Sequence, residues 1–159
     1  MKKKDYKENA QKVMRNKRAM RNYHVIDEVE AGIVLLGTEI KSIRLGKVSF
    51  KDSYAQIKNR EVILVSLHIS PYKFGNINNH DPIRERKLLL NKRQIKKFKS
   101  KIDEQGMTLI PKDLYVNEKG ICKITLALAK GKKLYDKRED IKKKDLKREN
   151  QRNIKNMGF

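Results

Sequence analysis

A chain of 159 residues can form one domain with a hydrophobic core, and its 40 lysines and arginines against 19 acids give a formal net charge of +21. Solubility requires a net charge of only about 2–8, so this excess favours nucleic acid as the partner over a surface that is merely solvated. The single cysteine, Cys122, excludes an internal disulfide, and no apolar stretch is long enough for a signal peptide or a membrane span, so we expect a cytoplasmic protein with no membrane partner.

The positive charge is concentrated at the two ends of the chain. Residues 1–22 carry nine basic and two acidic side chains, and residues 130–159 carry twelve and five, so each end has a net charge of +7. The 107 residues between them, with nineteen basic and twelve acidic side chains, also sum to +7. Because residues 1–22 also lack an apolar period, we expect them to form a basic N-terminal arm.

Strand and helix signals alternate in the first half of the body. Residues 23–36 alternate between apolar and polar positions and predict one long strand, kinked or bulged at Gly32. A short apolar face follows and predicts a helix that Thr38 caps and Gly46 ends. Two further strand-like runs predict a hairpin that turns at Asn59–Arg60, although this turn lacks glycine.

The second half of the body begins with a polar loop over residues 72–86 and a short buried strand over residues 87–90. Asn91 is expected to cap a helix that runs to about Gln105, with apolar residues spaced three and four apart. Two strands then flank the hairpin loop NEKG, and Pro111 places the first of them at an edge or a bulge.

These elements together predict a barrel. The strands number about six and are mostly sequential neighbours, and two to three helices accompany them. This pattern is typical of a mainly β, OB-fold-like antiparallel barrel, which we place over residues 23–133.

Residues 134–159 form a basic C-terminal tail in which the few apolar residues do not recur every three or four positions. No broad apolar stripe can therefore offset the entropy of folding. The tail has no proline and is rich in good helix formers. We expect it to be disordered when free and to become helical where phosphates neutralise it.

Motifs for catalysis are missing. The chain has no glycine-rich nucleotide-binding motif, and its histidines, His24, His68 and His80, lack the spacing of a metal site. Cys122 lies among alternating apolar residues and is interpreted as a core residue rather than a nucleophile. His80 with Asp81 is interpreted as part of a turn rather than a base–carboxylate pair. We therefore expect a protein that is not an enzyme and has no metal and no cofactor.

Two clusters of cations suit RNA binding, one after the polar loop and one at the start of the tail. They consist of Arg84, Arg86 and Lys87, and of Lys130, Lys132 and Lys133 around Gly131. Glycine in the second cluster lets the backbone approach a phosphate closely. The aromatic residues Tyr135 and Phe159 lie in the basic tail, where they either stack on bases or have no specific role.

Four stretches, in order along the chain, together resemble the SmpB family of bacterial proteins that bind transfer-messenger RNA (tmRNA). They are NKRAMRNY (16–23), EAGIVLLGTEIKSIRLGKVSFKDSYA (30–55), DPIRERKLLLNKRQI (81–95) and ALAKGKKLYDKRE (127–139). The resemblance implies an OB-like barrel that binds the tRNA-like domain of tmRNA as a monomer, one per RNA, and delivers it to ribosomes stalled on messages without a stop codon. It also implies that the protein takes the place of the anticodon arm, with its tail in the empty mRNA channel.

The resemblance also implies roles for individual residues. The motif positions associated with tmRNA binding are Asn16, Tyr23, Glu30, Leu89 and Asn91, and the segment that leads into the tail is Lys130, Gly131, Lys132 and Lys133. The segment implied to reach the decoding centre and its 16S rRNA is Tyr135, Asp136, Lys137 and Arg138. Tyr135 stands where some members have histidine, which preserves stacking but not a proton-dependent role. The sequence NIKNMGF at the C-terminus matches only loosely.

Three alternatives stay open on the sequence alone. Glu30 beside a polyanion either accepts hydrogen bonds from bases or ribose hydroxyls, or forms a salt bridge with a neighbouring cation. Leu89 is either a core residue or an apolar platform for a base. For the whole protein, the competing class is a ribosomal protein whose arms fold permanently into rRNA, which stoichiometry on ribosomes would distinguish. An RNA-processing enzyme would need a catalytic cluster that the sequence lacks.

Overall fold

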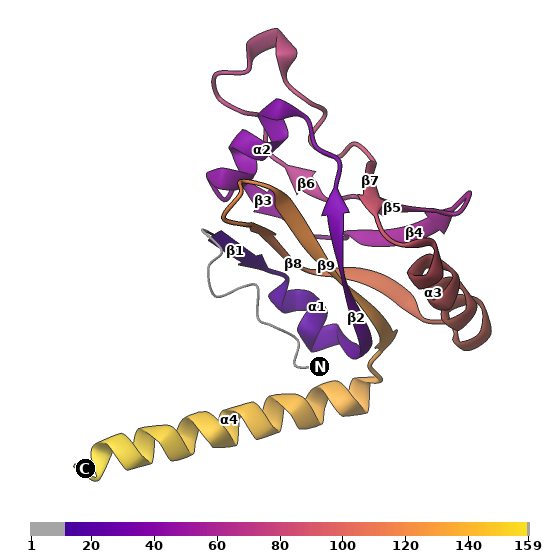
Figure 1. The fold of residues 1–159 in the computed structure, drawn as a ribbon. Helices are drawn as coiled ribbons and strands as arrows, with labels where there is room; N and C mark the ends of the chain where they lie inside the picture. Colours follow the sequence, from indigo (N-terminus) through magenta and orange to yellow (C-terminus); the bar gives the residue numbers. More distant parts are fainter. Residues whose placement is uncertain (1–11, 159) are drawn as a thin grey trace.

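The computed structural model describes residues 12–158 (Figure 1). Its strands are β1 (Lys12–Arg15), β2 (Tyr23–Ile33), β3 (Val48–Ser49), β4 (Tyr54–Lys58), β5 (Glu61–Val65), β6 (His68–Ile69), β7 (Arg86–Leu89), β8 (Thr108–Val116) and β9 (Cys122–Gly131). Its α-helices are α1 (Lys17–Asn22), α2 (Gly37–Arg44), α3 (Lys92–Gln105) and α4 (Leu134–Asn156), and a short 3-10 helix covers Asn76–Asn78.

The main sheet closes on itself. Its strand order is β1-β8-β4-β5-β7-β2-β9, and an additional pairing between β8 and β9 joins the last strand back to the second. All these pairings are antiparallel, so every strand of this sheet except β1 belongs to a closed ring of six. Closure leaves no free edge within the ring. The predicted mainly β antiparallel barrel of about six strands is confirmed.

The core lies inside this barrel and follows the two-residue period of its strands. Side chains with no exposed surface include Leu64, Leu114, Ile124 and Leu126. Helix α3 adds Ile95 and Phe98 from its apolar face, and Gly106, with φ of +62°, ends that helix in the left-handed conformation. Each such side chain contributes about 1.5–3 kcal/mol by leaving water, so the barrel is the main source of stability.

The N-terminal prediction needs correction, because residues 12–22 are part of the body. Strand β1 pairs with β8 along its whole length, and α1 buries Ala19 against Ile110 and Ala129. A four-residue strand and a six-residue helix are too short to show an apolar period, so the sequence pattern cannot distinguish them from an arm. Residues 1–11 of the predicted arm lie outside the described residues.

Local irregularities match the predictions in some places and differ in others. The turn at Asn59–Arg60 has positive φ at both residues (51° and 62°), which is the type I′ geometry of a two-residue hairpin. The register of β8 shifts between Pro111 and Asp113, as its proline predicts. The bulge in β2, however, lies between Val25 and Asp27 rather than at Gly32.

The start of α2 also differs from its prediction. Thr38 does not cap this helix, because its hydroxyl instead lies 2.8 Å from Nδ1 of His80. The carboxylate of Glu39 accepts a hydrogen bond from the backbone N–H of Leu36 and so satisfies that end of the helix. Gly46 follows the helix with φ of +74°, as predicted.

The tail differs from the expectation for the free protein. Residues Leu134–Asn156 form one continuous helix, α4, that lies outside the barrel, below α1 in Figure 1, and buries none of its residues. Good helix formers and the absence of proline explain its conformation locally. Because α4 gains nothing from burial, its folding on a partner stays a prediction.

Candidate nucleic-acid interface

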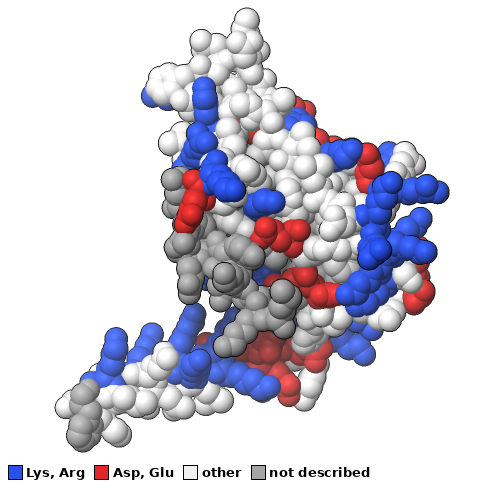
Figure 2. All heavy atoms as spheres, in the orientation of Figure 1, with Lys and Arg blue, Asp and Glu red and all other residues white. Residues whose placement is uncertain are grey.

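Lysine and arginine side chains gather over α3, over α2 and along α4, with acidic side chains between these groups (Figure 2). On α3 the inward face is apolar, so its cations all lie on the outer face. The exposed cations of this helix are Lys92, Arg93, Lys96, Lys97 and Lys99. The α3 group was not singled out as a site from the sequence, although the helical period alone could have identified a cationic face there.

The outer face of β2 and β7 brings two of the implied RNA-binding residues close together. Leu89 lies opposite Gly32 in the ladder, and a Cβ on Gly32 would meet the Leu89 side chain at 3.4 Å. Leu89 is 54% exposed, so it is a surface platform and not a core residue. Glu30 lies two residues before Gly32 on the same face and is exposed. Asn91 is exposed just beyond β7, at the start of α3, where its N–H donates to Gln94 Oε1.

Glu30 has a partner that neither sequence alternative named. The hydroxyl of Tyr115, from β8, donates a hydrogen bond to Glu30 Oε2. Burial of the Tyr115 ring, with this hydrogen bond to Glu30, raises the pKa of its phenol far above the usual range, so it stays a neutral donor. A carboxylate has about four acceptor positions, and one O–H leaves the exposed Glu30 able to accept hydrogen bonds from a ligand. The neighbouring Glu28 is the residue that pairs with a cation, Lys112.

Arg86 cannot contact an RNA, because its side chain has no exposed surface. It donates to Glu39 Oε1 at 2.8 Å and to the carbonyl of Leu67 at 2.6 Å. Arg84 forms a second ion pair with the same carboxylate at 2.6 Å. Burial opposes ionisation of Glu39, but hydrogen bonds from Arg84, from the Leu36 N–H and from Arg86 outweigh it and lower its pKa. The arginines therefore fix α2 to the base of β7, and the prediction of Arg86 as an RNA contact is wrong.

Asn16 is also a structural residue. It is 7% exposed, its Oδ1 accepts from the N–H of Ala19 at 3.1 Å, and its Nδ2 donates to the carbonyl of Pro111 at 2.8 Å. These bonds cap α1 and hold it against β8. Tyr23 packs partly buried beside Ala19. Both residues therefore hold α1 in place, and neither side chain is fully exposed for contact with an RNA.

The junction between barrel and tail is held by one ion pair, one backbone hydrogen bond and a contact between a histidine and a carboxylate. Lys132 Nζ lies 2.6 Å from Asp140 on the second turn of α4, and its backbone N–H donates to the carbonyl of Asn22 at 2.9 Å. The hydrogen bond from Lys132 lowers the pKa of Asp140. Asp136 lies 3.9 Å from Nε2 of His24, on β2. These contacts attach the first two turns of the helix to α1 and β2.

The remaining predicted cations and tail residues are distributed as follows. Lys130, Gly131 and Lys133 are exposed at the junction, and Lys87 is exposed on β7, where it pairs with Glu61 at 2.5 Å. Tyr135 is 70% exposed. The predicted tail residues Tyr135, Asp136, Lys137 and Arg138 form the first turns of α4. Phe159 lies outside the described residues.

Residues 12–158 contain neither a metal-binding cluster nor a membrane-spanning helix. Within this range no group of three or more histidine, cysteine or acidic residues is placed to hold a metal ion. Within the same range no helix combines the length and the apolar character needed to cross a membrane. Cys122 is buried in the core, and burial raises the pKa of its thiol to about 12, which is unsuited to nucleophilic chemistry.

Comparison with known proteins gives one consistent result. A family model described as SmpB protein matches residues 13–156. The SsrA-binding protein of Acetivibrio thermocellus is 54% identical over 149 residues, which cover 94% of this chain and 96% of that protein. The SsrA-binding protein of Geotalea uraniireducens is 55% identical over 137 residues, covering 86% and 90%. A chain in the solved structure "tmRNA-SmpB: a journey to the center of the bacterial ribosome" is 45% identical with a TM-score of 0.66, covering 77% of this chain and 85% of that one.

Proposed function

Because the chain belongs to the SmpB family, we propose that it is a tmRNA-binding protein of trans-translation. It binds the tRNA-like domain of tmRNA and brings that RNA to stalled ribosomes in the cytoplasm. There it takes the place of the anticodon arm, the tail enters the empty mRNA channel near the 16S rRNA of the decoding centre, and the nascent peptide is tagged. Its role is binding and positioning, with no catalytic step of its own.

The observation that carries this proposal is the outer face of β2 and β7. It combines an apolar platform, Leu89, with the acceptor Glu30 and the exposed amide of Asn91, which is the mixture that reads unpaired bases and ribose hydroxyls. The cations of α3 follow directly after Asn91 in the chain and supply phosphate contacts beside it. The phosphate contacts of the α3 cations supply affinity, and Leu89, Glu30 and Asn91 supply selectivity for the RNA.

The tail supports the second half of the proposal. Helix α4 extends from the barrel without burying a residue, so most of its cations are exposed and available to a surrounding polyanion such as an rRNA channel. Its first turn exposes Tyr135, and Lys137 and Arg138 follow, at the positions proposed to reach the decoding centre. The junction of Lys130, Gly131, Lys132 and Lys133 connects the two parts.

The test is the identity and stoichiometry of the RNA that co-purifies with the tagged full-length protein. We expect a tmRNA to be enriched over ribosomal RNA, and only a small fraction of ribosomes to carry the protein. Equal recovery of the protein with all ribosomes, without tmRNA enrichment, would instead identify a structural ribosomal protein. A variant with Glu30→Ala should lose the enrichment while still co-purifying with RNA nonspecifically, since its cations are intact.

A further inference from the structure

A second aromatic and cationic surface lies apart from the face described above. Residues 70–85 form a loop that projects beyond α2, at the end of the molecule opposite α4 (Figure 1). Its tip exposes Phe74 (71%) and Ile77 (98%) to solvent. The proposed function uses neither residue. An exposed ring on a loop of this length indicates a functional rather than a packing role.

The tip has a fixed shape. Asn79 bridges it, because its Oδ1 accepts from the N–H of Tyr72 and its Nδ2 donates to the carbonyl of Tyr72, both at 2.8 Å. The N–H of Gly75 donates to the same carbonyl at 2.9 Å. A Cβ on Gly75 would approach the Asn79 amide to 2.8 Å, so a larger residue there would displace this bridging amide. The loop therefore presents its ring without needing to order itself on binding.

The base of the loop is fixed to α2 by buried polar groups. His80 is 6% exposed and joins Thr38 on α2 to the carbonyl of Ile69 on β6, at 2.8 Å and 2.9 Å. The ion pairs of Glu39 with Arg84 and Arg86 add a second attachment. Helix α2 and the tip consequently form one rigid platform.

Cations surround the aromatic rings on this platform. The rings of Tyr72 and Phe74 meet edge to face, with centroids 5.6 Å apart. Lys41 Nζ lies 5.2 Å from the centroid of Tyr72, and Lys73 Nζ lies 5.8 Å from that of Phe74. Phe74 is the more accessible of the two rings, because it is exposed whereas Tyr72 is half-buried.

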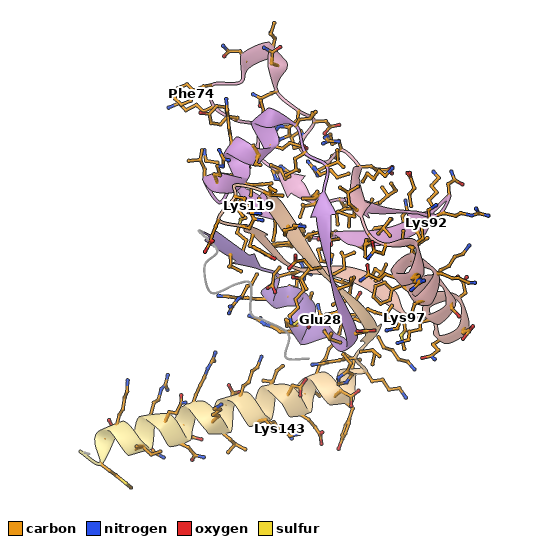
Figure 3. The ribbon with its side chains drawn as sticks, viewed as in Figure 1. Glu28, Phe74, Lys92, Lys97, Lys119 and Lys143 are labelled. Atoms are coloured by element: carbon orange, nitrogen blue, oxygen red, sulfur yellow. The ribbon has the colours of Figure 1, made fainter. Side chains whose placement is uncertain are left out.

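The cations continue along α2. Arg44 follows Lys41 by three residues, on the same face of the helix, and a guanidinium nitrogen of Arg44 lies 3.3 Å from where a Cβ of Gly120 would be. Gly120 belongs to the hairpin loop after β8, next to Lys119. Figure 3 shows Phe74 and Lys119 on either side of α2, and Figure 2 shows lysine and arginine side chains over the surface between them.

We propose that this platform, defined as Tyr72, Lys73, Phe74, Lys41 and Arg44, binds an unpaired segment of RNA. One base stacks on the ring of Phe74, and the adjoining phosphates lie against Lys41 and Arg44. The segment must be single-stranded, because a base within a duplex has no exposed face to offer. A protein partner fits less well, since a stable protein interface needs about 800 Å² per partner around an apolar centre, whereas here an aromatic pair stands among lysines.

The experiment uses the full-length protein, single-stranded oligoadenylate RNA and an RNA duplex of the same length. The salt concentration is raised until the duplex no longer binds, which suppresses contacts that depend on phosphates alone. Aromatic NMR signals of Phe74, identified by their loss in Phe74→Leu, are followed during titration with oligoadenylate. We expect these signals to move upfield as a base stacks on the ring.

Affinity provides the second measurement. Phe74→Ala should weaken binding of oligoadenylate by about 5–100-fold, the usual effect of losing one stacked base. The matched control, Ile77→Ala, removes an even more exposed apolar side chain from the same loop and should leave affinity unchanged. Either of two results would overturn the proposal: Phe74 signals that do not move at saturating oligoadenylate, or an equal loss in both variants. Because this binding requires neither Glu30 nor Leu89, the result is independent of the proposed function.

Discussion

The barrel and helix α4 are both rich in lysine and arginine, but they hold these cations in different ways. In the barrel, cations at the surface extend from elements that a buried core fixes, and several have acidic partners, such as Lys97 with Asp27. In α4 no residue is buried, and the polar contacts of Asp136 and Asp140 attach its first two turns to the body. The barrel is thus preorganised for its ligand, whereas the order of α4 depends on its surroundings.

Truncation after Lys133 separates the two regions and should have the largest effect. Tagging of stalled peptides should be abolished, because α4 is the part proposed to enter the mRNA channel. The melting temperature and the affinity for the RNA should change little, since α4 buries nothing. Thermal unfolding, RNA titration and a tagging assay measure the three quantities. A truncated protein that still supports tagging, or one that no longer binds the RNA, would contradict this division of labour.

Glu39→Gln tests the preorganisation of the barrel. It leaves the buried charge of Arg86 without its partner, so the free energy of unfolding should fall by about 3–5 kcal/mol. Chemical denaturation gives this value. The control is Glu61→Gln, which breaks a half-exposed pair with Lys87 and should cost less than about 1 kcal/mol. Equal losses in the two variants would mean that the buried network does not dominate.

Glu39 also makes the stability of the barrel depend on pH. Because its pKa is lowered in the folded state, its contribution is present above the unfolded value of 4.5 and is lost as the pH falls through the folded value. Denaturation measured at pH values below 4.5 should therefore show a smaller difference between the wild type and Glu39→Gln than at neutral pH. A constant difference across this range would show that ionisation of Glu39 is not the cause.

Substitutions at the proposed RNA face should affect binding and not folding. Glu30→Ala and Asn91→Ala should each weaken binding of the RNA by about 1–3 kcal/mol, the usual value of a specific base contact. Glu118→Ala removes the same charge as Glu30→Ala, from the exposed hairpin loop, and should not weaken binding. Titrations at fixed salt, paired with melting temperatures, distinguish the roles. A large loss of melting temperature without a binding defect would make Glu30 or Asn91 structural.

The smallest effect is expected for the surface pair of Asp27 with Lys97. A hydrogen bond from Lys97 lowers the pKa of Asp27, yet the Lys97 side chain is 57% exposed. Lys97→Gln should therefore change the free energy of unfolding by no more than about 1 kcal/mol. A double-mutant cycle with Asp27→Asn gives the coupling between the two residues. A larger coupling would show that surface charges in the barrel also stabilise its fold.

Sequence patterns succeeded where one period governs a whole element. The alternation of the strands, the spacing of α3 and the turn at Asn59–Arg60 predict the barrel correctly, and the family match confirms the resemblance that four motifs suggested. They failed where an element is too short to show a period, as in β1 and α1. The tail shows a third case, in which local helix propensity and the lack of a buried face point in different directions.

Residue roles were harder to predict than elements. Arg86 belongs to a charged run, RERK, yet it is buried because it points to the same side of β7 as Leu88. Predicting this burial requires knowing which alternate residues of the strand face the core. Leu89 lies in a continuous apolar run, which does not show which residues face the core. Its exposure could be recognised only from its pairing with Gly32 in the structure. The bond from Tyr115 to Glu30 joins residues 85 positions apart and depends on the barrel's closure.

The attachment of α4 at its first two turns makes the helix a lever. At 1.5 Å per residue, its 23 residues span roughly 35 Å, so a tilt of about 10° at the junction displaces the far end by about 6 Å. That displacement exceeds the pitch of one helical turn. The pairs of Lys132 with Asp140 and of His24 with Asp136 therefore determine the aim of the distal cations, although those cations are many turns away. A small change in these two contacts therefore moves the far end of α4 by a larger distance.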